Sequence, residues 1–122
     1  MERILIVEDE HEVAETMAVA LRRRGHQVDL AHTLAQAMKT SANDYPVILL
    51  DILLGTEKSF PFLKKIKEDN PSAIVIMVTA YDEDENVREA KRLGADAFLT
   101  KPFMTEYLEN LIISKINSLK KK

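Results

Sequence analysis

The sequence predicts an α/β fold in which a five-stranded parallel sheet lies between helices on both faces. Short apolar segments alternate with segments of helical periodicity about five times along the chain. The apolar segments, such as 4–7 and 47–50, have no polar residue at alternate positions. Strands of this kind are buried on both faces, which is typical of a parallel sheet covered by helices.

The predicted elements follow one another without a linker, a repeat or a low-complexity segment. β-Branched apolar segments predict the strands, and apolar side chains at helical spacing predict the helices. In 11–24, for example, Val13, Met17 and Leu21 share one helix face. The predicted strands are 4–7, 28–31, 47–50, 73–78 and 97–100, and the predicted helices are 11–24, 33–41, 59–70, 82–93 and 105–119.

Glycine, proline and hydroxyl residues mark the ends of these helices. Gly25 and Gly94 stand where a left-handed residue closes a helix. Ser59 is a good N-cap, and Pro61 is tolerated in a first helical turn. Pro71 prevents the third helix from continuing, so the boundaries of that helix are predicted on both sides.

Composition restricts the class of protein. The 122 residues are 46% hydrophobic, which suits one globular domain over 1–122. The net charge of -3 gives no general attraction to nucleic acid or to anionic membrane. The chain has no cysteine, which excludes disulfides and thiolate metal sites, and no apolar run long enough to span a membrane. We expect a cytoplasmic protein.

Acidic, hydroxyl or amine side chains directly follow four of the five predicted strands. They are Glu8 and Asp9, then Asp51, then Thr79, then Lys101. In open parallel sheets, ligands bind beyond the carboxyl ends of the strands. We therefore expect three acids, one hydroxyl and one ammonium group to form a single site.

This set of side chains suits phosphoryl transfer assisted by a metal ion. Clustered carboxylates repel one another unless a cation lies between them, and oxygen ligands without His or Cys favour Mg²⁺ (or Mn²⁺). A carboxylate such as that of Asp51 can form an acyl phosphate. Lys101 and the hydroxyl of Thr79 are the right groups to stabilise the negative charge on the transferred phosphoryl group.

Taken together, the motifs resemble the receiver domain of two-component response regulators over essentially the whole chain. The resemblance rests on VEDE after the first strand, LLDILL around Asp51, VTAY after the fourth strand and GADAFLTKPF near the end. It implies a flavodoxin-like sheet with strand order 2-1-3-4-5. It also implies that Asp51 is the phosphoacceptor, that Asp9 binds the metal directly, and that Glu8 acts through water.

The resemblance assigns four further features. The backbone carbonyl of Leu53 would complete the protein's share of the metal ligands. Thr79 and Lys101 would hold the phosphoryl group, with Thr79 also acting as a switch residue. Phe98 would be the aromatic switch residue, and the peptide between Lys101 and Pro102 would be cis.

The resemblance also implies partners. A histidine kinase or a histidine phosphotransfer protein would donate the phosphoryl group, and the domain would act as a phosphoacceptor switch rather than as an enzyme on other substrates. It would signal through the face made by its fourth helix, fifth strand and fifth helix. We expect no direct binding to nucleic acid or membrane, and either a monomer or a dimer that forms on phosphorylation.

Several positions depart from the family or leave alternatives open. Gly55 and Ser59 replace the family's proline and glycine after the phosphoacceptor. Leu111 stands where one branch of the family has a basic residue that pairs dimers, so it contacts a partner, is covered by a further domain, or packs in the core. The three histidines, His11, His26 and His32, lack metal-ligand spacing and are predicted to be exposed.

Three other functions fit the sequence less well. A metal-dependent phosphatase with an aspartyl nucleophile needs an acid two residues after it, where this chain has Leu53. A flavin-binding module needs a glycine- and hydroxyl-rich loop after the first strand, where three acids would repel the flavin phosphate. A receiver-like module that works without phosphorylation does not explain the complete set of site residues.

Overall fold

The computed structural model describes residues 2–79, 84–101 and 105–120, and it contains the predicted parallel sheet. The sheet has the order β2-β1-β3-β6-β7, with every neighbouring pair parallel. Its strands are β1 (Arg3–Val7), β2 (Gln27–Ala31), β3 (Val47–Asp51), β6 (Ile74–Thr79) and β7 (Ala97–Thr100). Because β6 and β7 are its fourth and fifth strands, the predicted order 2-1-3-4-5 is confirmed.

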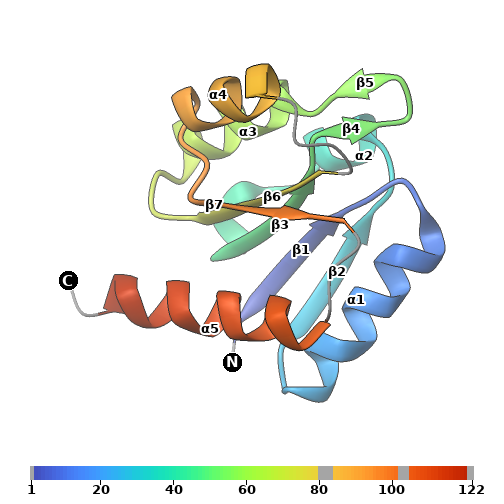
Figure 1. The fold of residues 1–122 in the computed structure, drawn as a ribbon, viewed down its shortest axis with the longest axis vertical. Coiled ribbons are helices and arrows are strands. Elements are labelled where there is room, and N and C mark those ends of the chain that lie inside the picture. Colours follow the sequence, from blue (N-terminus) through green and yellow to red (C-terminus); the bar gives the residue numbers. More distant parts are fainter. Residues whose placement is uncertain (1, 80–83, 102–104, 121–122) are drawn as a thin grey trace.

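Helices cover both faces of the sheet (Figure 1). The helices are α1 (His11–Arg23), α2 (Leu34–Met38), α3 (Phe60–Asp69), α4 (Asp84–Arg92) and α5 (Thr105–Lys120). Side chains of α1 and α5 pack on one face, whereas those of α2, α3 and α4 pack on the other. Successive strand residues point to opposite faces, so Ile4 and Ile6 enter one core and Leu5 and Val7 enter the other.

Capping side chains, glycines and local hydrogen bonds set several of the helix ends. The Thr33 hydroxyl accepts a hydrogen bond from the N–H of Gln36 and caps α2. Gly25 and Gly94 have φ of 90° and 102°, a backbone conformation that L side chains rarely adopt. Helix α2 ends at Met38, three residues before the predicted end, because the backbone N–H and hydroxyl of Thr40 both donate to the Ala37 carbonyl.

A short antiparallel hairpin follows β3 and was not predicted. It consists of β4 (Leu53–Leu54) and β5 (Glu57–Lys58), joined through Gly55, which has a φ of 65°. This segment departs from the sequence of the family that the chain resembles, because Gly55 replaces the usual proline. This glycine supplies the positive φ that the turn requires.

Residue Leu111 of α5 is partly buried and packs against the core shared by α1 and α5. Of the alternatives left open by the sequence, the structure therefore supports packing in the core. The same helix exposes Tyr107 and Ile113 to solvent.

Candidate functional site

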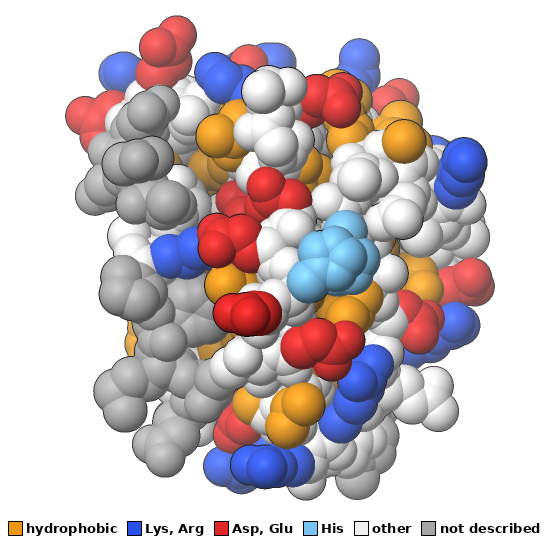
Figure 2. All heavy atoms as spheres, turned by 90° about the vertical axis from the view of Figure 1, so that its right-hand side faces the viewer, with side chains coloured by type: hydrophobic (Ala, Val, Ile, Leu, Met, Phe, Trp, Pro, Cys, Tyr) orange, Lys and Arg blue, Asp and Glu red, His pale blue; other side chains and the backbone are white. Residues whose placement is uncertain are grey.

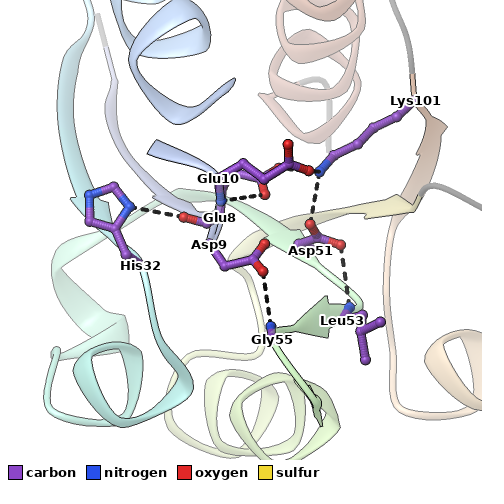
Figure 3. Close-up of polar contacts among 8 residues, drawn as sticks. All are labelled: Glu8, Asp9, Glu10, His32, Asp51, Leu53, Gly55 and Lys101. Carbon is purple, nitrogen blue, oxygen red and sulfur yellow. Dashed lines mark hydrogen bonds and ion pairs between the residues drawn. The ribbon is translucent and has the colours of Figure 1, made fainter. Parts of the chain in front are cut away.

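Four strands of the sheet bring the predicted site residues to one edge, and Figure 3 shows those that follow or end β1, β3 and β7. Glu8 and Asp9 follow β1, Asp51 ends β3, Thr79 ends β6, and Lys101 follows β7. The parallel register pairs Asp51 with Val78 and Thr79 with Thr100, so these strands end at the same level. The N–H of Lys101 donates to the carbonyl of Thr79 at 2.8 Å, which continues this register to the site.

Lys101 joins the acidic side chains. Its Nζ lies 2.9 Å from Oδ2 of Asp51 and also forms an ion pair with Oε1 of Glu8. Glu10 is a more distant partner, at 3.9 Å. Glu8 is 1% exposed and Asp51 is 6% exposed. The ammonium group therefore neutralises part of the charge that two buried carboxylates bring to the site.

Asp9 is held by the hairpin rather than by Lys101. Its Oδ2 accepts a hydrogen bond from the N–H of Gly55 at 3.0 Å, and Asp51 Oδ1 accepts one from the N–H of Leu53 at 3.3 Å. The unpredicted hairpin thus donates backbone hydrogen bonds to two of the three acids.

The surroundings shift the protonation equilibria of the site. Burial, together with the negative charge of Asp51, raises the pKa of Glu8 to about 7, against the opposing effect of Lys101. Burial would lower the pKa of Lys101, but its hydrogen bonds to Glu8 and Asp51 outweigh this effect and raise that pKa. For Asp9, burial acts to raise the pKa, but the N–H of Gly55 and other hydrogen bonds lower it overall.

The acid cluster fits a hard divalent cation. Glu8, Asp9 and Asp51 each offer a carboxylate oxygen, and these three oxygens lie within 4.8 Å of one another. Oxygen ligands are those that Mg²⁺ prefers, and Mg²⁺ takes one or two protein carboxylates and retains several waters. The ammonium group of Lys101, which contacts two of these acids, shows that the cluster accommodates positive charge.

Thr79 and Phe98 lie on β6 and β7, the two strands to one side of β3 in the sheet. Thr79 is buried at the end of β6. Phe98 is partly buried against the core on the α3 side, with Nζ of Lys91 5.7 Å from its ring centroid. The role of the Leu53 carbonyl stays a prediction, as does the cis peptide, because Pro102 lies outside the described residues.

Sequence reasoning missed one residue at this edge. His32 follows β2, and its Nδ1 lies 2.9 Å from the carbonyl oxygen of Glu8. The prediction that all three histidines are exposed is correct for His11 but wrong for His26 and His32, which are partly buried. Each of these two makes a backbone contact, His26 with the N–H of Glu2. His32 had the same signal as the predicted site residues, a polar side chain directly after a strand.

Comparison with known proteins identifies the family. A model of the response regulator receiver domain matches residues 4–113. The chain belongs to the response-regulator receiver family. Receiver domains of this family are phosphoacceptor switches of two-component systems.

Solved receiver structures share the fold. A CheY-like receiver domain protein from Methanospirillum hungatei has a TM-score of 0.93 and 30% identity, over 99% of this chain and 98% of that one. A two-component response regulator from Clostridium difficile has a TM-score of 0.90 and 25% identity, with 98% of each chain covered.

Curated relatives are longer proteins. The cyclic di-GMP phosphodiesterase of Thermotoga maritima is 38% identical over 105 residues, which are 86% of this chain and 28% of the relative. The transcriptional regulatory protein DltR of Streptococcus agalactiae is 33% identical over 107 residues, 87% of this receiver and 48% of the relative. This receiver thus spans less than half the length of these relatives. Within its described residues, no helix is long and apolar enough to cross a membrane.

Proposed function

We propose that this receiver domain accepts a phosphoryl group on Asp51, with Mg²⁺ (or Mn²⁺) bound by the neighbouring acids. The observation that carries the proposal is the position of Asp51. Its carboxylate ends β3 within the acid cluster, 2.9 Å from the Lys101 ammonium group. The donor would be a histidine kinase or a histidine phosphotransfer protein, in keeping with the family.

The chemical step follows from this arrangement. One carboxylate oxygen of Asp51 attacks the phosphorus of a phosphohistidine, the P–N bond breaks with its electrons going to the imidazole, and an acyl phosphate forms. Glu8, Asp9 and Asp51 would hold Mg²⁺, which would supply positive charge against the negative charge of the transferred group. Lys101, released from Asp51, donates to a phosphoryl oxygen, and the Thr79 hydroxyl donates to another.

Switching would begin at the strand ends that flank Asp51. The new negative charge would draw Thr79 and Lys101 toward the phosphoryl group. These two residues lie at the ends of β6 and β7, and within this strand pair Phe98 is the register partner of Met77. Phe98 therefore lies where a shift of these strand ends changes its packing. Output would leave through the face made by α4, β7 and α5, by a shift between two existing conformations.

The finer assignments belong to the same proposal. Residues 1–122 would form one receiver domain that works in the cytoplasm, as a monomer or as a dimer formed on phosphorylation. The domain would bind no nucleic acid or membrane directly, in keeping with its net charge of -3. Its own chemistry would be limited to gaining and losing the phosphoryl group.

Intact-mass measurement after incubation with acetyl phosphate tests the proposal. The parent should gain the mass of one phosphoryl group with Mg²⁺ and none with a chelator. Asp51→Asn keeps the shape but removes the nucleophilic charge, so it should gain none. Asp69→Asn, at the exposed end of α3, is the matched control and should be labelled like the parent. Equal labelling of Asp51→Asn would sink the assignment.

A further inference from the structure

The side chain of His32 reaches from the end of β2 to the backbone of the acidic turn between β1 and α1 (Figure 3). Its Nδ1 is 2.9 Å from the carbonyl oxygen of Glu8. A carbonyl oxygen only accepts hydrogen bonds, so Nδ1 carries a proton and donates it. The imidazole therefore holds the backbone of a residue whose side chain belongs to the acid cluster.

This hydrogen bond replaces one that the sheet would otherwise make. The N–H of Glu8 donates to the carbonyl of Ala31 at 3.0 Å, which extends the pairing of β1 with β2. In a regular parallel ladder, the next donor to the Glu8 carbonyl would be the backbone N–H of Thr33. The chain turns into α2 there, with Thr33 as the N-cap, and the His32 imidazole donates instead.

His32 is itself held at its ring and at its backbone. It stacks on the ring of His11 at the start of α1, with centroids 3.8 Å apart and planes inclined by 9°. The backbone N–H of His32 donates to Oε1 of Gln36 at 2.7 Å. Figure 2 shows histidine side chains together on a face that also carries acidic side chains. The turn from Glu8 to His11 is thereby braced at both ends through one imidazole.

The two histidines are poorly arranged to bind a metal themselves. Ring nitrogens bind metals along directions in the ring plane, and nearly parallel stacked rings point these directions side by side rather than toward one centre. Among the described residues, the group of three acidic or histidine ligands that converges is Glu8, Asp9 and Asp51. A mechanical role for His32 fits the geometry better than a ligand role.

We propose that His32 is a positioning residue of the metal site, because its Nδ1–H fixes the turn that carries Glu8 and Asp9. The inference rests on the proposed function of that site. Mg²⁺ requires near-ideal octahedral geometry, so a carboxylate displaced by a loosened turn binds it less well. Residues that orient ligands without touching the metal typically change metal affinity by about 10- to 100-fold.

Calorimetric titration with Mg²⁺ alone, at about pH 8 so that Glu8 is ionised, tests this role. His32→Phe keeps a flat ring against His11 but removes the donor, and it should weaken Mg²⁺ binding about 10-fold. His32→Asn loses the ring but places an amide N–H where Nδ1 lies, and it should bind Mg²⁺ nearly as tightly as the parent. Urea unfolding without metal measures the stability of each variant separately.

The outcomes separate the inference from the function on which it rests. If the parent binds Mg²⁺ and His32→Phe binds it equally well, the inference is overturned and the metal site stands. If both variants are equally weakened, ring packing matters rather than the donor, and the inference is again overturned. If the parent does not bind Mg²⁺, or Asp9→Asn binds it like the parent, the metal site and the inference both fail.

Discussion

At the residue scale, Glu8 is an acid with a raised pKa, because its carboxylate is buried beside Asp51. Its pKa of about 7 means that the group is protonated in part at neutral pH. Mg²⁺ binds the ionised form, so its affinity should increase as the pH rises through about 7. Titration calorimetry from about pH 6 to about pH 8 measures this dependence, and Glu8→Gln should remove most of it.

The same pKa has a consequence for stability without metal. The folded protein binds the Glu8 proton more tightly than the unfolded chain, whose pKa is near 4.5. The free energy of unfolding should therefore fall as the pH rises from about 4.5 to about 7, and this contribution should level off above that range. Urea unfolding of the parent and of Glu8→Gln across this range shows the difference. Parallel pH profiles for the two proteins would contradict the shift.

The hydroxyl of Ser59 is buried, which lowers the free energy of unfolding. Its side chain is 0% exposed, and its Oγ has no hydrogen-bond partner among the described residues. It precedes α3 without capping the helix through its side chain. Ser59→Ala should raise the free energy of unfolding by about 1 kcal/mol, because it removes an unsatisfied buried group.

Urea denaturation of the Ser59 variant needs a matched serine as its control. Ser72 is exposed and donates to Asn70, so Ser72→Ala should change stability little. Lower stability of Ser59→Ala than of the parent would show that the hydroxyl is satisfied in solution.

At the scale of elements, the β4–β5 hairpin links the backbone conformation at Gly55 to the acid Asp9. Gly55 has a φ of 65°, and nothing lies within 4 Å of where its Cβ would be. Gly55→Ala should therefore destabilise through backbone strain alone, by about 1 kcal/mol.

The matched variant at this position is Gly55→Asn, which should cost less because asparagine tolerates the left-handed conformation. Thermal or urea unfolding of the two variants ranks them. Equal stability of Gly55→Ala and the parent would mean that the turn adopts another conformation in solution.

At the scale of the whole molecule, Lys101 connects acids delivered by two other strands. Its side chain is 16% exposed and contacts both Glu8 and Asp51. Lys101→Met leaves these carboxylates without their ammonium partner. Without metal, the free energy of unfolding should fall by about 2 kcal/mol, less than for a fully buried pair, because Glu8 can take up a proton.

The same variant should bind Mg²⁺ more tightly, since the ammonium group no longer competes for the carboxylates. Calorimetric titration of Lys101→Met with Mg²⁺, beside Lys64→Met on the exposed surface of α3, measures this effect. Weaker binding to Lys101→Met than to the parent would show that the lysine supports the metal rather than replacing it.

The sequence by itself determined the sheet, the helices and most of the site. Strands that are apolar at every position can be buried only between two layers, and this pattern is local, so 4–7 and 47–50 were readable directly. Residues after parallel strands meet at one edge whatever the detailed packing. For that reason Glu8, Asp9, Asp51 and Lys101 could be grouped before any distance was known.

Tertiary structure alone decided which of these groups touch. The pairing of Lys101 with Glu8, the hydrogen bond from Gly55 to Asp9 and the contact of His32 with Glu8 join segments far apart in the chain. Such contacts depend on strand order, register and the turn after each strand, none of which has a local periodicity. Leu111 shows the same limit, because its apolar character fits a partner surface and a core equally, and only the packing of α5 against the sheet separates the two.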